Sequence, residues 1–306
     1  MLPYEYSFTN RSGWPAVRAP LYFSSFRAGF WWPLAVAMAA CLAAAPIGRS
    51  AAASEPSLVL RLDGREVAIG RDALLAHPAA QDIDISRDPS YDRPMRYRAV
   101  PLPALLQGFD LPKQGVLEAA ATDGFVAQIP LAPALGRGEA RAYVAVEPAN
   151  ALWPPLPGKP KSAGPFYLVW QDGEADGIGP EQWPYMLASL AIRQAPTQRW
   201  PQIAVAASLA KSDPAREGEA MFVKHCLACH RINGGGASEL GPDLNVPMNP
   251  VEYFQPAALR RYLRDPTSVR AWPDQKMPGF AVEHLSETEL DQLIAYLRHM
   301  SGRRQP

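Results

Sequence analysis

Two cysteines three positions apart, followed at once by a histidine, are the side chains of this sequence best suited to chemistry: Cys226, Cys229 and His230. On one helical turn, two thiols at this spacing can each add to one vinyl group of a haem, and the adjacent histidine then lies under the iron as a ligand. A zinc site would need a second pair of ligands, and a redox dithiol would need a surrounding βαβ unit. The one remaining cysteine, Cys41, lies in the predicted targeting segment, and the sequence around the motif shows no βαβ pattern. The motif therefore predicts one covalently attached haem c.

Helices are expected to position this motif, because from Asp213 onward the sequence carries helix signals in place of the strand-like alternation found before it. Asp213 is a capping residue, and Pro214 follows at the first helical position, so a helix should begin there and run toward Cys226. A second helix is expected over about residues 256–264, where it ends before Asp265-Pro266.

The last helix has the clearest signals. Ser286 is a capping residue, Glu289 completes a capping box, and Leu285 can pack against Leu290. Apolar residues then recur at helical spacing and form a single face: Leu290, Leu293, Ile294 and Leu297.

Several short motifs follow one another in this helical part: Gly218, Phe222, Gly241-Pro242-Asp243-Leu244, Leu259, Tyr262-Leu263, Asp265-Pro266, Lys276-Met277-Pro278-Gly279 and Tyr296. In this order they resemble a class I cytochrome c domain, and the resemblance covers residues 214–302. It implies an all-α fold in which Tyr296 of the last helix crosses the first helix at Gly218 and Phe222.

The resemblance also implies a role for each residue near the iron. Cys226 and Cys229 would hold the porphyrin, and His230 would be the proximal ligand. Pro242 would accept a hydrogen bond from the other ring nitrogen of His230, which fixes the tautomer.

Met277 would be the distal ligand, and its soft thioether sulfur would favour ferrous iron and raise the potential. The alternative for any single methionine is core packing, and the rival ligand is Met248. We expect His225 to be an exposed neighbour of the motif, and His284 and His299 to be surface residues.

Residues 54–194 are predicted to form a mainly β (α+β) domain. Asp63-Gly64 and Asp123-Gly124 are turn dipeptides between apolar runs, so each indicates a hairpin. His77, before Pro78, is expected at the end of a short helix. Further strands are expected at residues 95–100, 143–146 and 166–170. A proline-containing stretch, residues 195–213, is expected to link the two domains.

Part of this first domain resembles the molybdopterin domain of sulfite-oxidase-type enzymes. The resemblance lies in three stretches: Val100-Pro101-Leu102, residues 121–131 and residues 164–169. That family holds molybdenum through a cysteine thiolate, and residues 54–194 contain no cysteine. We therefore expect a degenerate domain that binds no molybdenum and serves as a scaffold or docking surface. Its alternating arginines are expected to form a solvated face: Arg93, Arg96 and Arg98.

Residues 1–53 are predicted to be a targeting segment. An apolar run, residues 30–45, precedes three alanines at positions 51–53, and this pattern predicts cleavage before Ser54. Because haem c is attached after translocation, we expect the protein in the periplasm. The alternatives are an uncleaved membrane anchor and a lipoprotein attached at Cys41.

The composition narrows the function further. Apolar residues make up 48% and charged residues 20% of the chain, and the formal net charge is zero, which argues against binding to nucleic acid. The first hypothesis is an electron carrier, or the cytochrome subunit of a periplasmic oxidoreductase, with no catalytic site of its own. Its partners would be redox proteins, a dehydrogenase and/or a terminal oxidase. The alternatives are a molybdopterin-dependent oxidoreductase with a fused haem domain, and a haem sensor or peroxidase.

Overall fold

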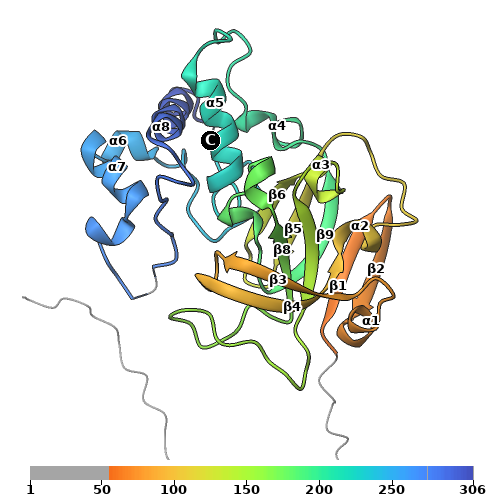
Figure 1. Cartoon of the computed structure of the whole chain (residues 1–306). Coiled ribbons are helices and arrows are strands. Elements are labelled where there is room, and N and C mark those ends of the chain that lie inside the picture. The colour runs from red at the N-terminus through yellow and green to blue at the C-terminus, as the bar shows by residue number, and fades with distance from the viewer. Residues whose placement is uncertain (1–54, 274, 306) are drawn as a thin grey trace, which may run out of the picture. The chain divides into compact units, whose positions relative to one another are not determined.

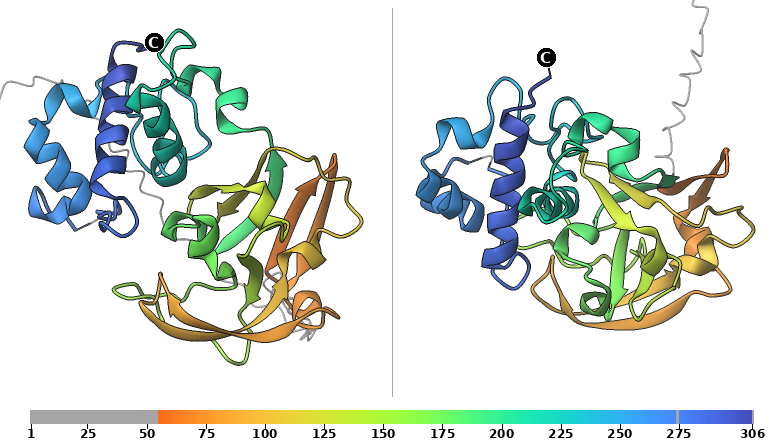
Figure 2. Two further views of the ribbon diagram at one scale, coloured as in Figure 1. Left: turned by 45° about the horizontal axis from the view of Figure 1, so that its top comes forward. Right: turned by 90° about the horizontal axis from the view of Figure 1, so that it is seen from above.

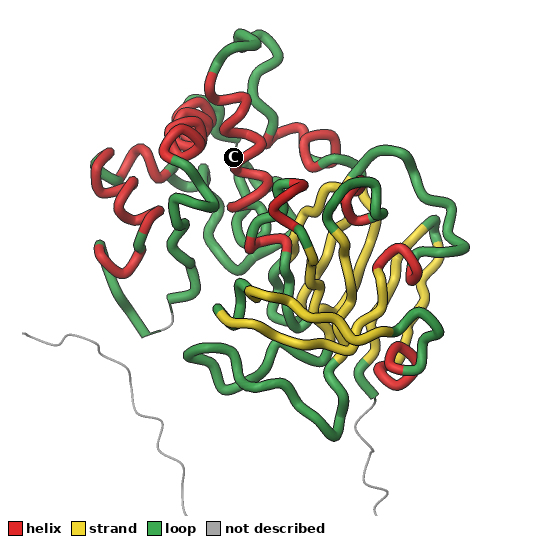
Figure 3. Tube along the Cα trace, viewed as in Figure 1, coloured by secondary structure: helices red, strands yellow, loops and turns green. Residues whose placement is uncertain are grey.

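The structure, a computed structural model, describes residues 55–273 and 275–305, which belong to one compact unit, Ala53–Pro306 (Figure 1). The predicted targeting segment, residues 1–53, lies outside the described residues. All nine strands of the described residues come before the longer helices, and Figure 3 shows the strands gathered in one part of the unit, with short helices beside them, and the longer helices in another part. The predicted fold class, a β-rich region before a helical region, is confirmed. Within residues 55–273 and 275–305, no helix is both long and apolar enough to cross a membrane.

The first sheet has five strands in the order β2-β1-β9-β5-β6. All neighbours in it are antiparallel except β1 and β9, which run parallel. Both predicted hairpins are present, and the turn residues Asp63, Gly64 and Gly124 have the positive φ values of 46°, 81° and 95° that these tight turns require. The strands are β1 (Ser57–Leu62), β2 (Arg65–Gly70), β5 (Val116–Ala121), β6 (Val126–Pro130) and β9 (Leu187–Arg193).

The second sheet is antiparallel, with the order β3-β4-β7-β8. Arg93, Arg96 and Arg98 lie exposed along β4, so the predicted solvated face is confirmed. Arg96 and Arg98 pair with Asp82 on the neighbouring strand, at 3.5 and 3.7 Å. The strands are β3 (Gln81–Asp88), β4 (Arg93–Pro101), β7 (Arg141–Val146) and β8 (Phe166–Gln171).

One hydrophobic core joins the two sheets. Leu58, Leu60 and Leu117 of the first sheet and Leu168 and Trp170 of the second are buried in it together. Short helical segments close the ends of this β-rich region: α1 (Arg71–Leu75), α2 (Leu102–Leu105), α3 (Leu131–Ala134), η1 (Gly173–Asp176) and η2 (Pro180–Gln182).

The segment predicted as a linker, residues 195–213, packs against both regions. It contains α4 (Pro196–Arg199) and η3 (Pro201–Ile203). Arg199 forms an ion pair with Glu118 of β5, while Ile203 is fully buried in the helical core and its carbonyl accepts a hydrogen bond of 2.7 Å from the hydroxyl of Tyr296. This segment therefore fastens the helical region to the sheets.

The first and last helices of the helical region cross at a glycine, as expected. The views in Figure 2 show α8 (dark blue) beside α5 (teal). At Gly218 a Cβ atom would lie 2.7 Å from Cβ of Tyr296, and the rings of Phe222 and Tyr296 are 5.2 Å apart. The elements are α5 (Pro214–Met221), a π-helical turn η4 (Phe222–Cys226), α6 (Pro250–Tyr253), α7 (Pro256–Arg264), η5 (Pro266–Ser268) and α8 (Glu287–Ser301).

The predicted capping box of α8 is present. Ser286 accepts a hydrogen bond from the backbone N–H of Glu289, and Glu289 in return accepts one of 2.8 Å from the N–H of Ser286. Leu285 and Leu290 are both buried, which agrees with the predicted apolar contact. The hydroxyl of Ser286 also donates a hydrogen bond of 2.7 Å to the carboxylate of Glu289. This bond, followed by the one from the N–H of Ser286, holds the pKa of Glu289 below its ordinary value of 4.5.

Replacing the capping serine should therefore weaken α8. We expect Ser286→Ala to reduce the free energy of unfolding by about 1 kcal/mol at pH 7, measured by urea titration. A carboxyl with a lowered pKa stabilises the fold above its unfolded pKa, and this contribution is lost as pH falls through the folded value. The difference between variant and wild type should accordingly shrink when the pH is taken below about 4.5. Thr288→Ala, an exposed change in the same turn, is the control, and an equal loss there would contradict the assignment.

Candidate haem-binding site

The two cysteines and the histidine lie on one tight turn at the end of η4. The backbone N–H of Cys229 and that of His230 both donate to the carbonyl of Cys226, at 3.1 and 2.8 Å. The turn begins with a π-type hydrogen bond of 2.9 Å from the N–H of Leu227 to the carbonyl of Phe222. Such wide turns are often found at functional sites, since they redirect the side chains that follow.

Both thiols are free; Cys226 is buried in the hydrophobic core of the helical region, and Cys229 is partly buried. Burial raises the pKa of the Cys229 thiol to about 11, with smaller contributions from the charges of Asp123 and Glu181. Burial and the charge of Glu181 also raise the pKa of Cys226. A redox dithiol needs the opposite, a lowered pKa that yields thiolate. In the part of the chain that the structure describes, no group of three or more His, Cys, Asp or Glu side chains could hold a metal ion.

The ring of His230 is held from two sides. Its Nδ1 donates a hydrogen bond of 2.8 Å to the carbonyl of Pro242, the contact expected from the sequence. Gly241 lies flat against the ring, where a Cβ atom would come within 2.5 Å of Nδ1, and its own N–H bonds to the carbonyl of Cys229 at 2.8 Å. Burial lowers the pKa of His230. The imidazole is therefore oriented with Nε2 as the nitrogen that remains for a ligand.

Met277 is carried by a loop that is anchored on α7. Three residues further on, the N–H of Phe280 donates to the carbonyl of Leu263, and the guanidinium of Arg264 donates to the carbonyl of Phe280, both at 2.9 Å. A Cβ atom at Gly279 would come within 3.1 Å of the carbonyl carbon of Arg264, so only glycine lets the loop approach the helix end this closely.

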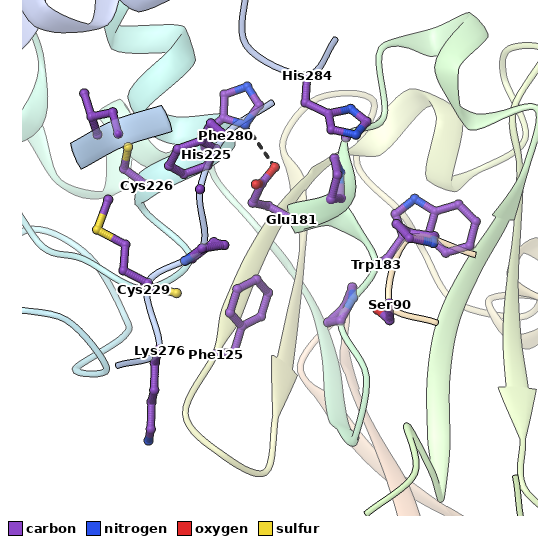
Figure 4. A pocket seen from close by; sticks show the side chains of 18 of the residues that line it. Ser90, Phe125, Glu181, Trp183, His225, Cys226, Cys229, Lys276, Phe280 and His284 are labelled. Carbon is purple, nitrogen blue, oxygen red and sulfur yellow. Dashed lines mark hydrogen bonds and ion pairs between the residues drawn. The ribbon is translucent and has the colours of Figure 1, made fainter. Parts of the chain in front are cut away.

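A cavity of about 2270 Å³ brings these side chains together. Cys226, Cys229, His230 and Met277 all line it. Figure 4 shows a close view in which Glu181 and Trp183 of the β-rich region line the same cavity. Met248, the rival sulfur ligand, is 50% exposed and is not among the described residues that line the cavity.

Comparison with known families decides what this helical region is. Residues 215–301 match the model of the cytochrome c family. This segment is a cytochrome c domain. Membership implies a covalently bound haem c and a role in electron transfer. Comparison of the chain with curated proteins gives no match.

The side chains of the cytochrome c domain fit a haem c. Two free thiols face the cavity that also contains an oriented imidazole and a thioether, and these are the donors that two covalent bonds and two axial bonds require. Any side chain at position 241 would collide with the ring of His230, so glycine is required there for the imidazole to keep this orientation. The resemblance of residues 54–194 to a sulfite-oxidase-type domain gains no such support and stays a prediction.

The expectation for His225 was wrong, because this residue is buried and only 3% exposed. Its Nδ1 donates to a carboxylate oxygen of Glu181 at 2.9 Å, and its ring packs at 75° to that of Phe280. Its contacts therefore come both from Phe280 of the cytochrome c domain and from Glu181 of the β-rich region. No sequence signal near His225 could have shown this, since Glu181 is 44 residues away.

His284 and His77 lie where the sequence placed them, whereas His299, expected at the surface, is partly buried. His284 is exposed, and His77 closes a helix end by accepting a 3.1 Å hydrogen bond from the N–H of Ala79. His299 is partly buried, since it accepts a hydrogen bond of 3.1 Å from the N–H of Ala206. Neither His77 nor His299 is among the described residues that line the cavity.

Proposed function

We propose that this protein is an exported, mono-haem c-type cytochrome that transfers single electrons. The observation that carries the proposal is the arrangement of Cys226, Cys229 and His230 around one cavity, with the hydrogen bond from His230 to Pro242 leaving Nε2 free. In this proposal Cys226 and Cys229 hold the haem, and His230 and Met277 ligate its iron.

Each residue then has a physical task. The carbonyl of Pro242 accepts the hydrogen bond from Nδ1–H of His230, which keeps the imidazole in one tautomer and raises the basicity of Nε2. The anchored loop holds the thioether of Met277 in the cavity, and a soft sulfur donor favours ferrous iron. The haem, when bound, supplies the one-electron chemistry. Buried neighbours such as Leu227 and Ala228 keep water from the attachment turn.

The partners in this proposal are redox proteins, a dehydrogenase that supplies electrons and/or a terminal oxidase that takes them up. The location is the periplasm, and residues 1–53 would supply the export signal or, if uncleaved, a membrane anchor. The β-rich region would act as a scaffold or docking surface. A molybdopterin-dependent activity is not favoured, because both cysteines in the described part of the chain belong to the haem motif.

Redox titration of the holoprotein tests the proposal. We expect absorbance changes that fit a reversible one-electron process with one haem per chain. Met277→Ala should lower the potential by on the order of 0.2 V, about a quarter of the roughly 0.8 V range that axial ligands span. The same variant should lose the sulfur-to-iron absorption of the ferric protein, because water or a weaker ligand replaces the thioether.

Met248→Ala is the matched control, since it also removes one methionine from the cytochrome c domain but at an exposed position. It should leave potential and spectrum unchanged. If instead Met248→Ala abolished the sulfur-to-iron absorption and Met277→Ala did not, the ligand assignment would be wrong. A wild-type protein that took up no electron at all would refute the proposed function itself.

A further inference from the structure

A carboxylate of the β-rich region contacts the residue that precedes the haem-attachment turn, which we define as residues 226–230. Glu181 lies on the short helical turn η2, and one of its carboxylate oxygens is 2.9 Å from Nδ1 of His225, the residue directly before Cys226. The side chain of His225 is fully buried, and that of Glu181 is 11% exposed. Figure 4 shows the two side chains pointing toward each other, with Phe280 beside them.

The neighbouring residue Gln182 strengthens this contact. Its amide nitrogen donates a hydrogen bond of 3.0 Å to the carbonyl of Lys224, and its amide oxygen accepts one of 2.8 Å from the N–H of Gly179. Two consecutive residues of η2 therefore bind the two consecutive residues that precede Cys226. Two such part-buried hydrogen bonds from neighbouring residues fix an orientation more strictly than a single exposed one.

A second set of contacts holds the attachment turn from the other side. The N–H of Val126, at the start of β6, donates to the carbonyl of Ala228, which lies between the two cysteines, at 3.0 Å. The hydroxyl of Ser238 donates to the carbonyl of Gly124 in the β5–β6 turn at 2.8 Å. The β-rich region therefore also forms hydrogen bonds with the turn that carries both cysteines and with the nearby residue Ser238.

Among these contacts, only the one from Glu181 brings a negative charge. Glu181 lines the same cavity as Cys226 and Cys229, so its carboxylate lies on the side of the attachment turn that faces this cavity. The other ring nitrogen of His225 has no hydrogen-bond partner among the residues that the structure describes. Within the cytochrome c domain, Glu289 is the carboxylate on which His225 and Lys224 act electrostatically.

We propose that Glu181 is a positioning residue for the haem: it holds His225, and with it the attachment turn, against the β-rich region, and it places a largely buried negative charge at the cavity that would hold the haem. This inference rests on the proposed function. A charge in a partly buried site acts more strongly than one in water. The negative charge stabilises the more positive ferric state, so Glu181 lowers the potential. The β-rich region then influences electron transfer without carrying a cofactor of its own.

Charge and hydrogen bonding can be separated at this position by substitution in the full-length holoprotein. Glu181→Gln keeps an oxygen that accepts the hydrogen bond from His225 but removes the charge, whereas Glu181→Asp keeps the charge. Glu174→Gln removes an exposed carboxylate from another part of the same cavity and is the control. The potential is measured by redox titration at one pH and ionic strength, and thermal unfolding verifies that each variant is folded.

Glu181→Gln is expected to raise the potential, seen as a several-fold higher ratio of ferrous to ferric haem at a fixed applied potential. Glu181→Asp should restore most of the wild-type ratio, and Glu174→Gln should not change it. A folded Glu181→Gln protein with the wild-type potential, or an equal shift in Glu174→Gln, would overturn the inference. These outcomes leave the proposed function intact, whereas a wild-type chain without covalent haem would refute that function before any variant is compared.

Discussion

Replacing both Cys226 and Cys229 with serine is expected to abolish covalent haem attachment completely. The wild-type protein should keep its haem through denaturation in acid and organic solvent, because thioether bonds survive conditions under which axial bonds dissociate. Serine hydroxyls do not form these thioethers, so the double variant should lose every trace of haem on a denaturing gel stained for haem. The expected change runs from one haem per chain to none.

The third cysteine supplies the control for this experiment. Cys41→Ser removes a thiol from the predicted targeting segment and should leave haem attachment unchanged. The single variant Cys229→Ser should still retain haem through the thioether at Cys226. Covalent haem in the double variant would show that the attachment site lies elsewhere.

Gly218→Val is expected to destabilise the cytochrome c domain by about 3 kcal/mol or more, the upper end of what overpacking costs. A side chain at Gly218 would collide with the carbonyl of Gln292 on α8 and come within 2.7 Å of Cβ of Tyr296. These are backbone and Cβ atoms of a 15-residue helix, so no flexible side-chain end can move out of the way. Urea unfolding followed by far-ultraviolet circular dichroism and haem absorbance measures the effect.

Ala220→Val is the matched control for helix propensity. Ala220 is exposed two positions further along α5, so valine there should cost no more than about 0.7 kcal/mol. If both variants lost the same stability, the loss would come from valine in a helix and the close crossing of α5 and α8 would contribute nothing. The difference between them isolates the contact at Gly218.

Local signals account for most of what the sequence predicted. The capping box at Ser286 and the turn at Asp63-Gly64 depend on residues next to each other in the chain, and both are present. The contact between His230 and Pro242 spans only 12 residues and followed from the family resemblance. Two strands were not predicted. In β3 most residues are polar and exposed, and β9 is a short apolar run that a buried helix segment would equally match.

Contacts between distant segments could not be predicted in this way. The burial of His225 depends on Glu181, and the packing of Ile203 depends on Tyr296, 93 residues later. Prolines around residues 195–213 indicated a linker between the two domains, because proline interrupts helices and strands. Here prolines instead begin short turns, η3 among them, that dock onto the helical core.

The position of β9 constrains the order in which the β-rich region can form. This strand is the last of the region in the chain, yet it is the middle strand of the first sheet, between β1 and β5. Its pairing with β1 joins Val59 to Ser189, so the sheet stays in two separate hairpins until nearly the whole region has been synthesised. Non-local pairing of this kind slows folding, because the chain must lose the entropy of closing a long loop before the stabilising contacts form. A shortened chain that ends before Leu187 would lack the strand that holds both hairpins together, and would expose their edges to other chains.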